Sequence, residues 1–183
     1  MDELVKHIIT LVQERSVRDY VTEQLVSICR HDTSPSADVD VMRQAEAAVF
    51  DILEKQLAEN AFVGAHWERR PINPAIVQHP AYSQLHFTKT AERPQGLPPE
   101  IVYADRSNLL YFVPGADGRE QGGIALNAHI DVIAPYLPPR VENGIVHGRG
   151  ACDDKGAVVV IIAALRLLAQ VLKKAGRKLK RNI

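Results

Sequence analysis

Along residues 2–59, apolar side chains recur every three or four positions, which is the spacing of one face of an α-helix. The pattern begins with Leu4 and Ile8 and continues to Cys29, where a polar loop interrupts it. It returns from Val39 to Glu59. We therefore expect amphipathic helices over this part of the chain, each burying one face.

The pattern then becomes strand-like and after that irregular. Residues 61–68 are predicted to form a strand, but from Arg69 to Asp105 prolines exclude long regular elements. These prolines are Pro71, Pro74, Pro80, Pro94, Pro98 and Pro99. Residues 69–105 are therefore expected to form an irregular surface insertion.

Regular patterns resume beyond the insertion. Nearly continuous apolar runs predict strands at 108–113 and 123–129, and Asn143-Gly144 predicts a two-residue hairpin turn. A long apolar helix is predicted over residues 155–174, with Gly176 as its stop. Apolar strands flanked by helices are typical of an α/β fold with a mostly parallel sheet covered on both faces.

The charge of the chain gives no reason to expect a nucleic acid or a membrane as partner. It carries 22 basic and 22 acidic residues, so its net charge is zero. The basic cluster near the C-terminus lacks aromatic residues for base stacking, and we interpret it as cations at the end of helix 155–174. Arg166 and Gln170 interrupt the apolar run of that helix, which favours a buried helix over a membrane span.

The cysteines and the N-terminus favour a reducing, cytoplasmic location. Cys29 and Cys152 are too few for a disulfide framework. The first residues lack the basic and apolar regions of a secretory signal. Cys152 lies in a glycine-rich turn and is interpreted as a small packing residue.

Candidate chemistry begins where the apolar run 123–129 ends. Residues two apart in a strand share a face, so His129 and Asp131 are expected to point the same way. A carboxylate that accepts the N–H of one imidazole nitrogen leaves the other nitrogen free to bind a metal. Taken alone, such a pair is more often a structural hydrogen bond.

A second group of carboxylates, Asp153 and Asp154, lies among glycines just before the long helix. Neighbouring carboxylates repel unless a cation or a basic side chain compensates them, and Lys155 and Arg149 are expected to contribute. Carboxylate oxygens and a neutral imidazole suit Zn²⁺, and a bridging carboxylate suits two such ions. The alternative is an N-cap motif, with both carboxylates at the positive end of the helix.

Segments 126–135 and 148–156 closely resemble the co-catalytic zinc amidohydrolase and exopeptidase family. That family includes acetylornithine deacetylase, succinyl-diaminopimelate desuccinylase, carnosinase-type dipeptidases, glutamate carboxypeptidase and the aminoacylases. The resemblance extends over about residues 108–176. Two positions depart from it, because Ala128 replaces a usual glycine and His147 a common aromatic residue.

This resemblance implies roles for three residues. His129 is expected to bind one metal, Asp131 to be the catalytic-site carboxylate that orients it, and Asp153 to bridge both metals. The metals implied are two Zn²⁺ ions per complete site, with Co²⁺ or Mn²⁺ as substitutes. The family pattern also implies a cis peptide bond between Asp153 and Asp154.

By the same resemblance, residues 1–183 are expected to form the N-terminal part of a catalytic domain. Its fold class is α/β, a partial three-layer αβα arrangement missing its C-terminal strands and a dimerisation domain. Residues 123–156 hold the metal-site segments. The family takes its general base from a Glu-Glu pair on the strand after the long helix, so the site is expected to be incomplete. An apolar sheet edge is expected to stay uncovered and to promote association.

The implied activity is hydrolysis of amide bonds in small peptides or N-acylated amino acids, by a dinuclear zinc mechanism. The complete enzyme is expected to be a homodimer. The alternative is a truncated, non-catalytic module that binds metal weakly or not at all. Metal binding and turnover distinguish these two hypotheses.

Overall fold

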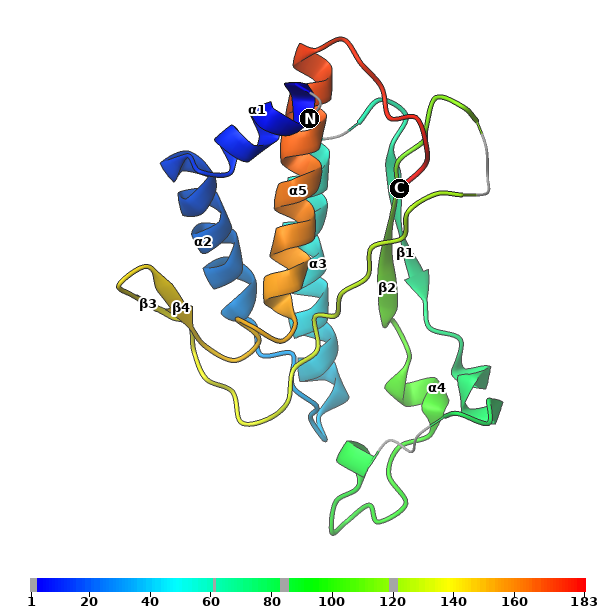
Figure 1. Ribbon diagram of the computed structural model, residues 1–183. Helices are drawn as coiled ribbons and strands as arrows, with labels where there is room; N and C mark the ends of the chain where they lie inside the picture. The colour runs from blue at the N-terminus through cyan, green and yellow to red at the C-terminus, as the bar shows by residue number, and fades with distance from the viewer. Residues whose placement is uncertain (1–2, 61, 83–85, 119–121) are drawn as a thin grey trace.

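The chain is described by a computed structural model, which covers four ranges separated by short gaps. The described residues are 3–60, 62–82, 86–118 and 122–183. They form an α/β structure in which a group of helices lies beside a two-stranded sheet (Figure 1).

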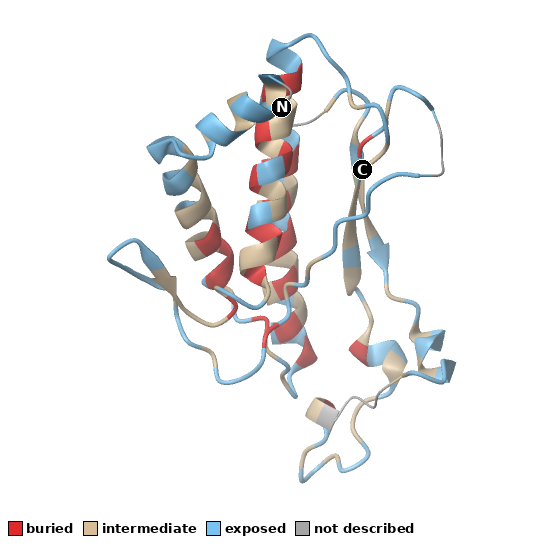
Figure 2. Cartoon of the chain, in the orientation of Figure 1, coloured by how far each residue is buried: buried red, intermediate tan, exposed pale blue. Residues whose placement is uncertain are grey.

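The helical group contains α1 (Glu3–Leu11), α2 (Arg15–Cys29), α3 (Val39–Glu59) and α5 (Lys155–Lys174). These bounds confirm the helices predicted before residue 60, except at Asp2, which lies outside the described residues. Their shared core consists of Leu25, Ile28, Cys29, Val49, Phe50, Leu53, Val158 and Val159. Burial is accordingly concentrated on α2, α3 and α5 (Figure 2).

Helix α5 has the bounds that the sequence predicted and lies at the centre of the helical group. It packs against α1, α2 and α3, although its length and composition alone would also allow it to cross a membrane. Arg166 lies over the ring of Tyr20 on α2, at 4.2 Å from its centroid. Gly176, two residues beyond the last residue of the helix, has φ +62°, and the amide of Arg177 donates to Leu172 O. This is the Schellman geometry that favours glycine.

The described residues form two antiparallel pairs of strands. Strand β1 (His66–Pro71) pairs with β2 (Ser107–Phe112), and β3 (Arg140–Glu142) pairs with β4 (Ile145–His147). The predicted Asn143-Gly144 turn joins the second pair, with φ 51° and 78°, the left-handed values that a type I′ turn requires. The hairpin prediction is therefore confirmed.

Two strand predictions need correction. The first strand begins later than the predicted range 61–68, and residue 61 itself lies outside the described residues. Residues 123–129 are extended but form no strand, so the described residues contain no parallel sheet. The physical reason is that a groove separates this segment from β2, and a strand requires a hydrogen-bonded neighbour.

Within residues 69–105, the described residues contain the end of β1, which runs to Pro71, and three short elements: η1 (Pro74–Gln78), η2 (His86–Thr88) and α4 (Pro99–Val102). A small cluster of Val39, Met42 and Val102 packs α4 against the start of α3. Just beyond the insertion, Arg106 Nη2 lies 2.7 Å from Glu46 Oε1, in a largely buried ion pair. The apolar cluster and the ion pair thus both anchor the C-terminal part of the insertion to α3.

Candidate metal centre

The candidate centre forms where the extended segment 123–132 passes the turn before α5. His129 and Asp131 come from the segment, and Asp153 and Asp154 come from the turn. The Asp153-Asp154 peptide bond is cis, as the family resemblance implied. Gly150, at φ +85°, lies in the same turn, where an added Cβ would approach Val132 to 2.8 Å. The turn therefore requires glycine at this position.

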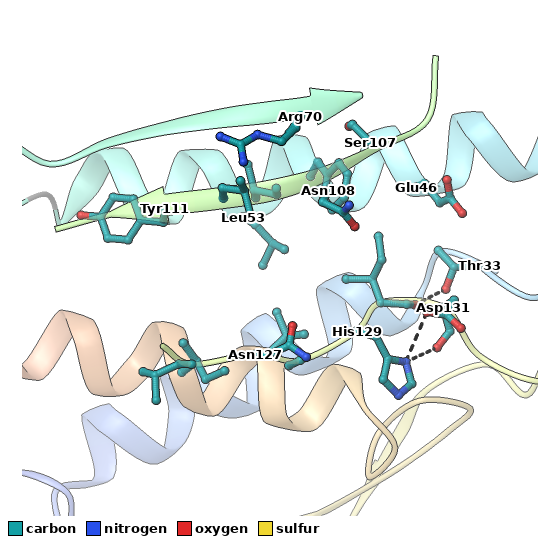
Figure 3. Close-up of a pocket in the computed structure, with 18 of the residues that line it drawn as sticks. Thr33, Glu46, Leu53, Arg70, Ser107, Asn108, Tyr111, Asn127, His129 and Asp131 are labelled. Carbon is teal, nitrogen blue, oxygen red and sulfur yellow. Dashed lines mark hydrogen bonds and ion pairs between the residues drawn. The ribbon is translucent and has the colours of Figure 1, made fainter. Parts of the chain in front are cut away.

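The two nitrogens of His129 face carboxylates from different segments. Nδ1 lies 3.0 Å from Asp131 O and 3.3 Å from Asp131 Oδ1, as the dashed lines in Figure 3 show. Nε2 lies 3.4 Å from Asp153 Oδ1. A proton on Nδ1 donated to Asp131 leaves the Nε2 lone pair directed towards Asp153.

Asp154 fixes the backbone of the same residue. Its Oδ2 accepts a hydrogen bond of 3.2 Å from His129 N and lies 4.0 Å from His129 Nε2. Its side chain is 24% exposed, whereas that of Asp153 is 88% exposed. Asp154 therefore joins the two segments, and Asp153 keeps its oxygens free for a ligand.

The electrostatic environment of His129 favours positive charge. Partial burial lowers the pKa of the ring, but the hydrogen bond to Asp131 O and the carboxylates of Asp131, Asp154 and Asp153 outweigh it. The pKa of His129 is therefore raised above its ordinary value of 6.5. Carboxylates that stabilise an imidazolium also stabilise a cation bound beside a neutral ring.

The spacing of His129 Nε2 and Asp153 Oδ1 fits a shared zinc ion. Zinc binds nitrogen and carboxylate oxygen at about 2.0–2.2 Å, so a tetrahedral angle separates two ligand atoms by about 3.4 Å. That is the distance between these two atoms. In the part of the chain that the structure describes, however, no group of three or more His, Cys, Asp or Glu is arranged to hold a metal.

Two further side chains, those of Thr33 and Tyr136, support the site, and sequence patterns did not reveal them. Thr33 Oγ1 donates to Ile130 O at 2.5 Å, and Val132 N donates to Thr33 O at 3.3 Å. Tyr136 Oη donates to the carbonyl oxygens of both Cys29 and Arg30. These bonds join the end of α2 and its following loop to the metal-site segment. They connect residues about a hundred positions apart, which no local pattern encodes.

Lys155 and Arg149 differ from expectation. Lys155 is fully buried and donates to His31 O at 2.7 Å instead of to Asp153 or Asp154. Burial lowers its pKa. Arg149 Nε donates to Pro135 O. Neither bond compensates the carboxylate pair, so that prediction is wrong, and both residues hold loops in place.

The two cysteines also differ from each other. Cys29 is fully buried in the helical core, and burial raises its pKa. Cys152 is exposed, so its interpretation as a packing residue is wrong.

Comparison with known proteins shows that the part of the chain that carries the candidate centre is similar to a known family. Residues 125–182 match the sequence model of Peptidase family M20/M25/M40. A LysW-lysine/LysW-ornithine hydrolase of Saccharolobus solfataricus is 42% identical over 91 residues, which are 49% of this chain and 24% of that protein. A Peptidase M20 domain-containing protein of Schizosaccharomyces pombe is 42% identical over 48 residues, or 26% of this chain and 12% of that protein.

The matched residues include all three predicted site positions, His129, Asp131 and Asp153. The resemblance to the zinc hydrolase family is therefore confirmed over residues 125–182. The chain spans about a quarter or less of the length of these relatives. No solved structure matches the chain significantly.

Proposed function

We propose that this chain contributes half of a metal centre to a hydrolase that cleaves amide bonds in small peptides or N-acylated amino acids. The single observation that carries the proposal is the convergence of His129 Nε2 and Asp153 Oδ1 to 3.4 Å, with Nδ1 held by Asp131. The family match over the same residues supports a metal-dependent reaction.

Each side chain has a distinct task in this proposal. His129 binds one metal through Nε2, and Asp131 holds its ring and its Nδ1 proton. Asp153 offers a bridging carboxylate, and Asp154 holds the backbone of His129 against the turn. Two Zn²⁺ ions, or Co²⁺ or Mn²⁺ in their place, supply a Lewis acid for the scissile carbonyl and an acidified water.

The remaining parts of the proposal concern the complete enzyme. It has a three-layer αβα catalytic domain with a mostly parallel sheet, a general base on a strand after α5, and a dimerisation domain that makes it a homodimer. Its location is the cytoplasm, and neither nucleic acid nor membrane is a partner. The family resemblance supports the fold, the general base and the dimerisation domain. Composition supports the location and the exclusion of nucleic acid and membrane as partners.

The alternative is a module that binds metal weakly and turns over no substrate. The strong exposure of Asp153 and the lack of a three-ligand group among the described residues favour this alternative for the 183 residues by themselves. Two ligands give a cation less binding energy than the three or four that zinc enzymes use.

Metal titration by calorimetry with Zn²⁺ and Co²⁺ tests the proposal. We expect measurable binding that Asp153→Asn abolishes, and Asp131→Asn is expected to weaken it about 10- to 100-fold, as loss of a ligand-orienting carboxylate does. Asp19→Asn is the matched control, because Asp19 is an exposed carboxylate on α2.

Equal binding by Asp153→Asn and Asp19→Asn contradicts the metal centre. Activity on a panel of acylated amino acids then separates the two functions. Turnover by the 183-residue chain excludes the non-catalytic module. No turnover combined with specific metal binding supports half of a centre that another segment completes.

A further inference from the structure

One buried residue of the loop after α2 bonds to the metal-site segment on both sides of Asp131. This residue is Thr33, which is 1% exposed. Its hydroxyl donates to Ile130 O at 2.5 Å, and its own carbonyl oxygen accepts a hydrogen bond of 3.3 Å from Val132 N. Figure 3 shows Thr33 beside the part of the segment that carries Asp131. The residue before Asp131 and the residue after it are therefore both held by Thr33.

These two bonds fix the backbone of Asp131. The carbonyl group of Ile130 belongs to the peptide unit before the Cα of Asp131, and the amide of Val132 belongs to the unit after it. Because peptide units are planar, holding one polar group of each unit restricts both backbone dihedral angles of Asp131. Thr33 therefore determines the direction in which the side chain of Asp131 leaves the segment.

The second of these peptide units also supplies an acceptor for the ring of His129. The bond between Asp131 and Val132 is trans, so its N–H and C=O groups point in opposite directions. The N–H group donates to Thr33 O, and the carbonyl oxygen lies 3.0 Å from His129 Nδ1. A rotation of this unit that broke its bond to Thr33 would therefore also move the carbonyl oxygen away from Nδ1.

Thr33 can hold another residue because its own position is fixed. Its β-branched side chain has restricted rotation about χ1. The fully buried Lys155 donates to His31 O at 2.7 Å, two residues before Thr33. Ser34 N donates to Asp32 Oδ1 at 3.0 Å, which forms an Asx turn around Thr33. The loop is thus held on both sides of the residue that bonds to the metal-site segment.

We propose that Thr33 is a positioning residue that holds Asp131 and, through it, the imidazole ring of His129. Its hydroxyl and its carbonyl oxygen keep Asp131 O and Oδ1 at Nδ1, so that Nε2 faces Asp153. The consequence for metal affinity rests on the proposed function. The consequence for the ring of His129 does not, because it concerns the metal-free chain.

Two substitutions separate the hydroxyl of Thr33 from its shape. Thr33→Val keeps the volume of the side chain and loses the donor, whereas Thr33→Ser keeps the donor and loses a methyl group. Thr88→Val is the matched control, because Thr88 is also 1% exposed and its Oγ1 accepts a hydrogen bond from Leu97 N in the insertion. Both valine variants remove a buried hydroxyl that bonds to backbone, so we expect similar losses in Tm.

The first readout is the tautomer of His129 in the metal-free chain, measured by ¹⁵N NMR at about pH 9, where an imidazole is neutral. The resonances of this ring are identified by their loss in His129→Gln. In the unaltered chain, Thr33→Ser and Thr88→Val we expect the proton on Nδ1. In Thr33→Val we expect both ring nitrogens to shift towards the values of the Nε2–H tautomer, because the acceptors at Nδ1 are no longer held.

The second readout is the affinity for Zn²⁺, measured by calorimetry. Thr33→Val should weaken binding about 10- to 100-fold, as the loss of a residue that orients a metal ligand does. Thr33→Ser and Thr88→Val should bind as the unaltered chain does. In a chain that already carries Asp131→Asn, Thr33→Val should weaken binding little further, because Thr33 acts through Asp131.

A third measurement needs no substitution at residue 33. The amide of Val132 donates to the buried Thr33, whereas the neighbouring Ile133 is 70% exposed. We therefore expect hydrogen exchange of the Val132 amide to be at least about tenfold slower than that of the Ile133 amide. Equal exchange of the two amides would overturn the proposal even if Thr33→Val did not fold.

The remaining outcomes separate positioning from stability. Unchanged ring resonances in Thr33→Val, with the same loss in Tm as Thr88→Val, would show that Thr33 only stabilises the fold. Ring resonances of Thr33→Ser that match those of Thr33→Val would also overturn the proposal, because the hydroxyl would then have no part in it. A shifted ring in Thr33→Val, in a chain that binds no zinc, supports the positioning role and contradicts only the metal centre.

Discussion

At the scale of residues, both nitrogens of the His129 imidazole face carboxylates, Nδ1 that of Asp131 on the same segment and Nε2 that of Asp153 on the turn before α5. The sequence placed His129 and Asp131 on one face of an extended segment, and this follows from spacing alone. The approach of Asp153 depends on how the turn before α5 docks, which spacing does not determine. The roles of these residues as ligands remain predictions.

Tyr103, near the groove, gives a residue-scale prediction. Burial and the neighbouring Tyr82 raise the pKa of Tyr103 from 10.0 to about 12. The folded chain therefore keeps this proton to a higher pH than the unfolded chain does. The stabilisation is complete below pH 10 and is lost as the pH rises towards 12. Urea unfolding over this range should show a smaller loss of unfolding free energy in Tyr103→Phe than in the unaltered chain.

Other groups also titrate at alkaline pH, but they do so in both proteins. The difference between the two curves therefore isolates Tyr103. Parallel curves throughout this range would contradict the raised pKa.

At the scale of elements, local sequence patterns predicted the helices correctly, but they did not predict which strands pair. Helix α5 has its predicted bounds because its apolar run is followed by two lysines and then by the stop residue Gly176, and the β3–β4 hairpin follows from Asn143-Gly144. Both signals are contained in neighbouring residues. The segment 123–129 has equally strong strand composition, but it has no hydrogen-bonded neighbour in the described chain. Pairing is a tertiary property, so its absence could not be read from composition.

The ion pair between Arg106 and Glu46 provides the element-scale prediction, since it anchors the end of the insertion to α3. Both side chains are largely buried and meet through two hydrogen bonds of 2.7 and 2.9 Å. Arg106→Leu leaves a buried carboxylate without its partner and should lower the free energy of unfolding by about 3–5 kcal/mol. Urea denaturation measures this loss.

The exposed pair of Arg140 and Glu142 is the control. Arg140→Leu should cost no more than about 1 kcal/mol. The double variant Glu46→Leu with Arg106→Leu should be more stable than Arg106→Leu alone, because it removes the unpaired charge. A double variant that is less stable than the single one would show that packing, and not charge, dominates.

At the scale of the whole molecule, the helices form a complete apolar core while the groove beside β2 stays open. The exposed apolar side chains Ile124 and Leu126 line this groove. The sequence analysis expected an uncovered apolar edge near α5, and the structure has one. What the sequence did not reveal is that Thr33 and Ile183 line this groove and bond to Ile130 and Val113, because these contacts join distant parts of the chain.

This open groove predicts association between molecules as concentration rises. We expect light scattering to detect oligomers of the 183-residue chain, and Leu126→Lys to reduce them, because the charge opposes burial of the groove between molecules. Ile133→Lys adds the same charge outside the groove and should have a smaller effect. A chain that stays monomeric at high concentration would refute this expectation.

The contrast between the two thiols has a practical consequence. Cys29 lies wholly inside the helical core, whereas Cys152 stands at the surface. An alkylating reagent therefore has immediate access to the sulfur of Cys152, but it reaches that of Cys29 only when α2, α3 and α5 separate. The rate of alkylation of Cys29 therefore reports opening of the helical core, and alkylation of Cys152 serves as the internal reference.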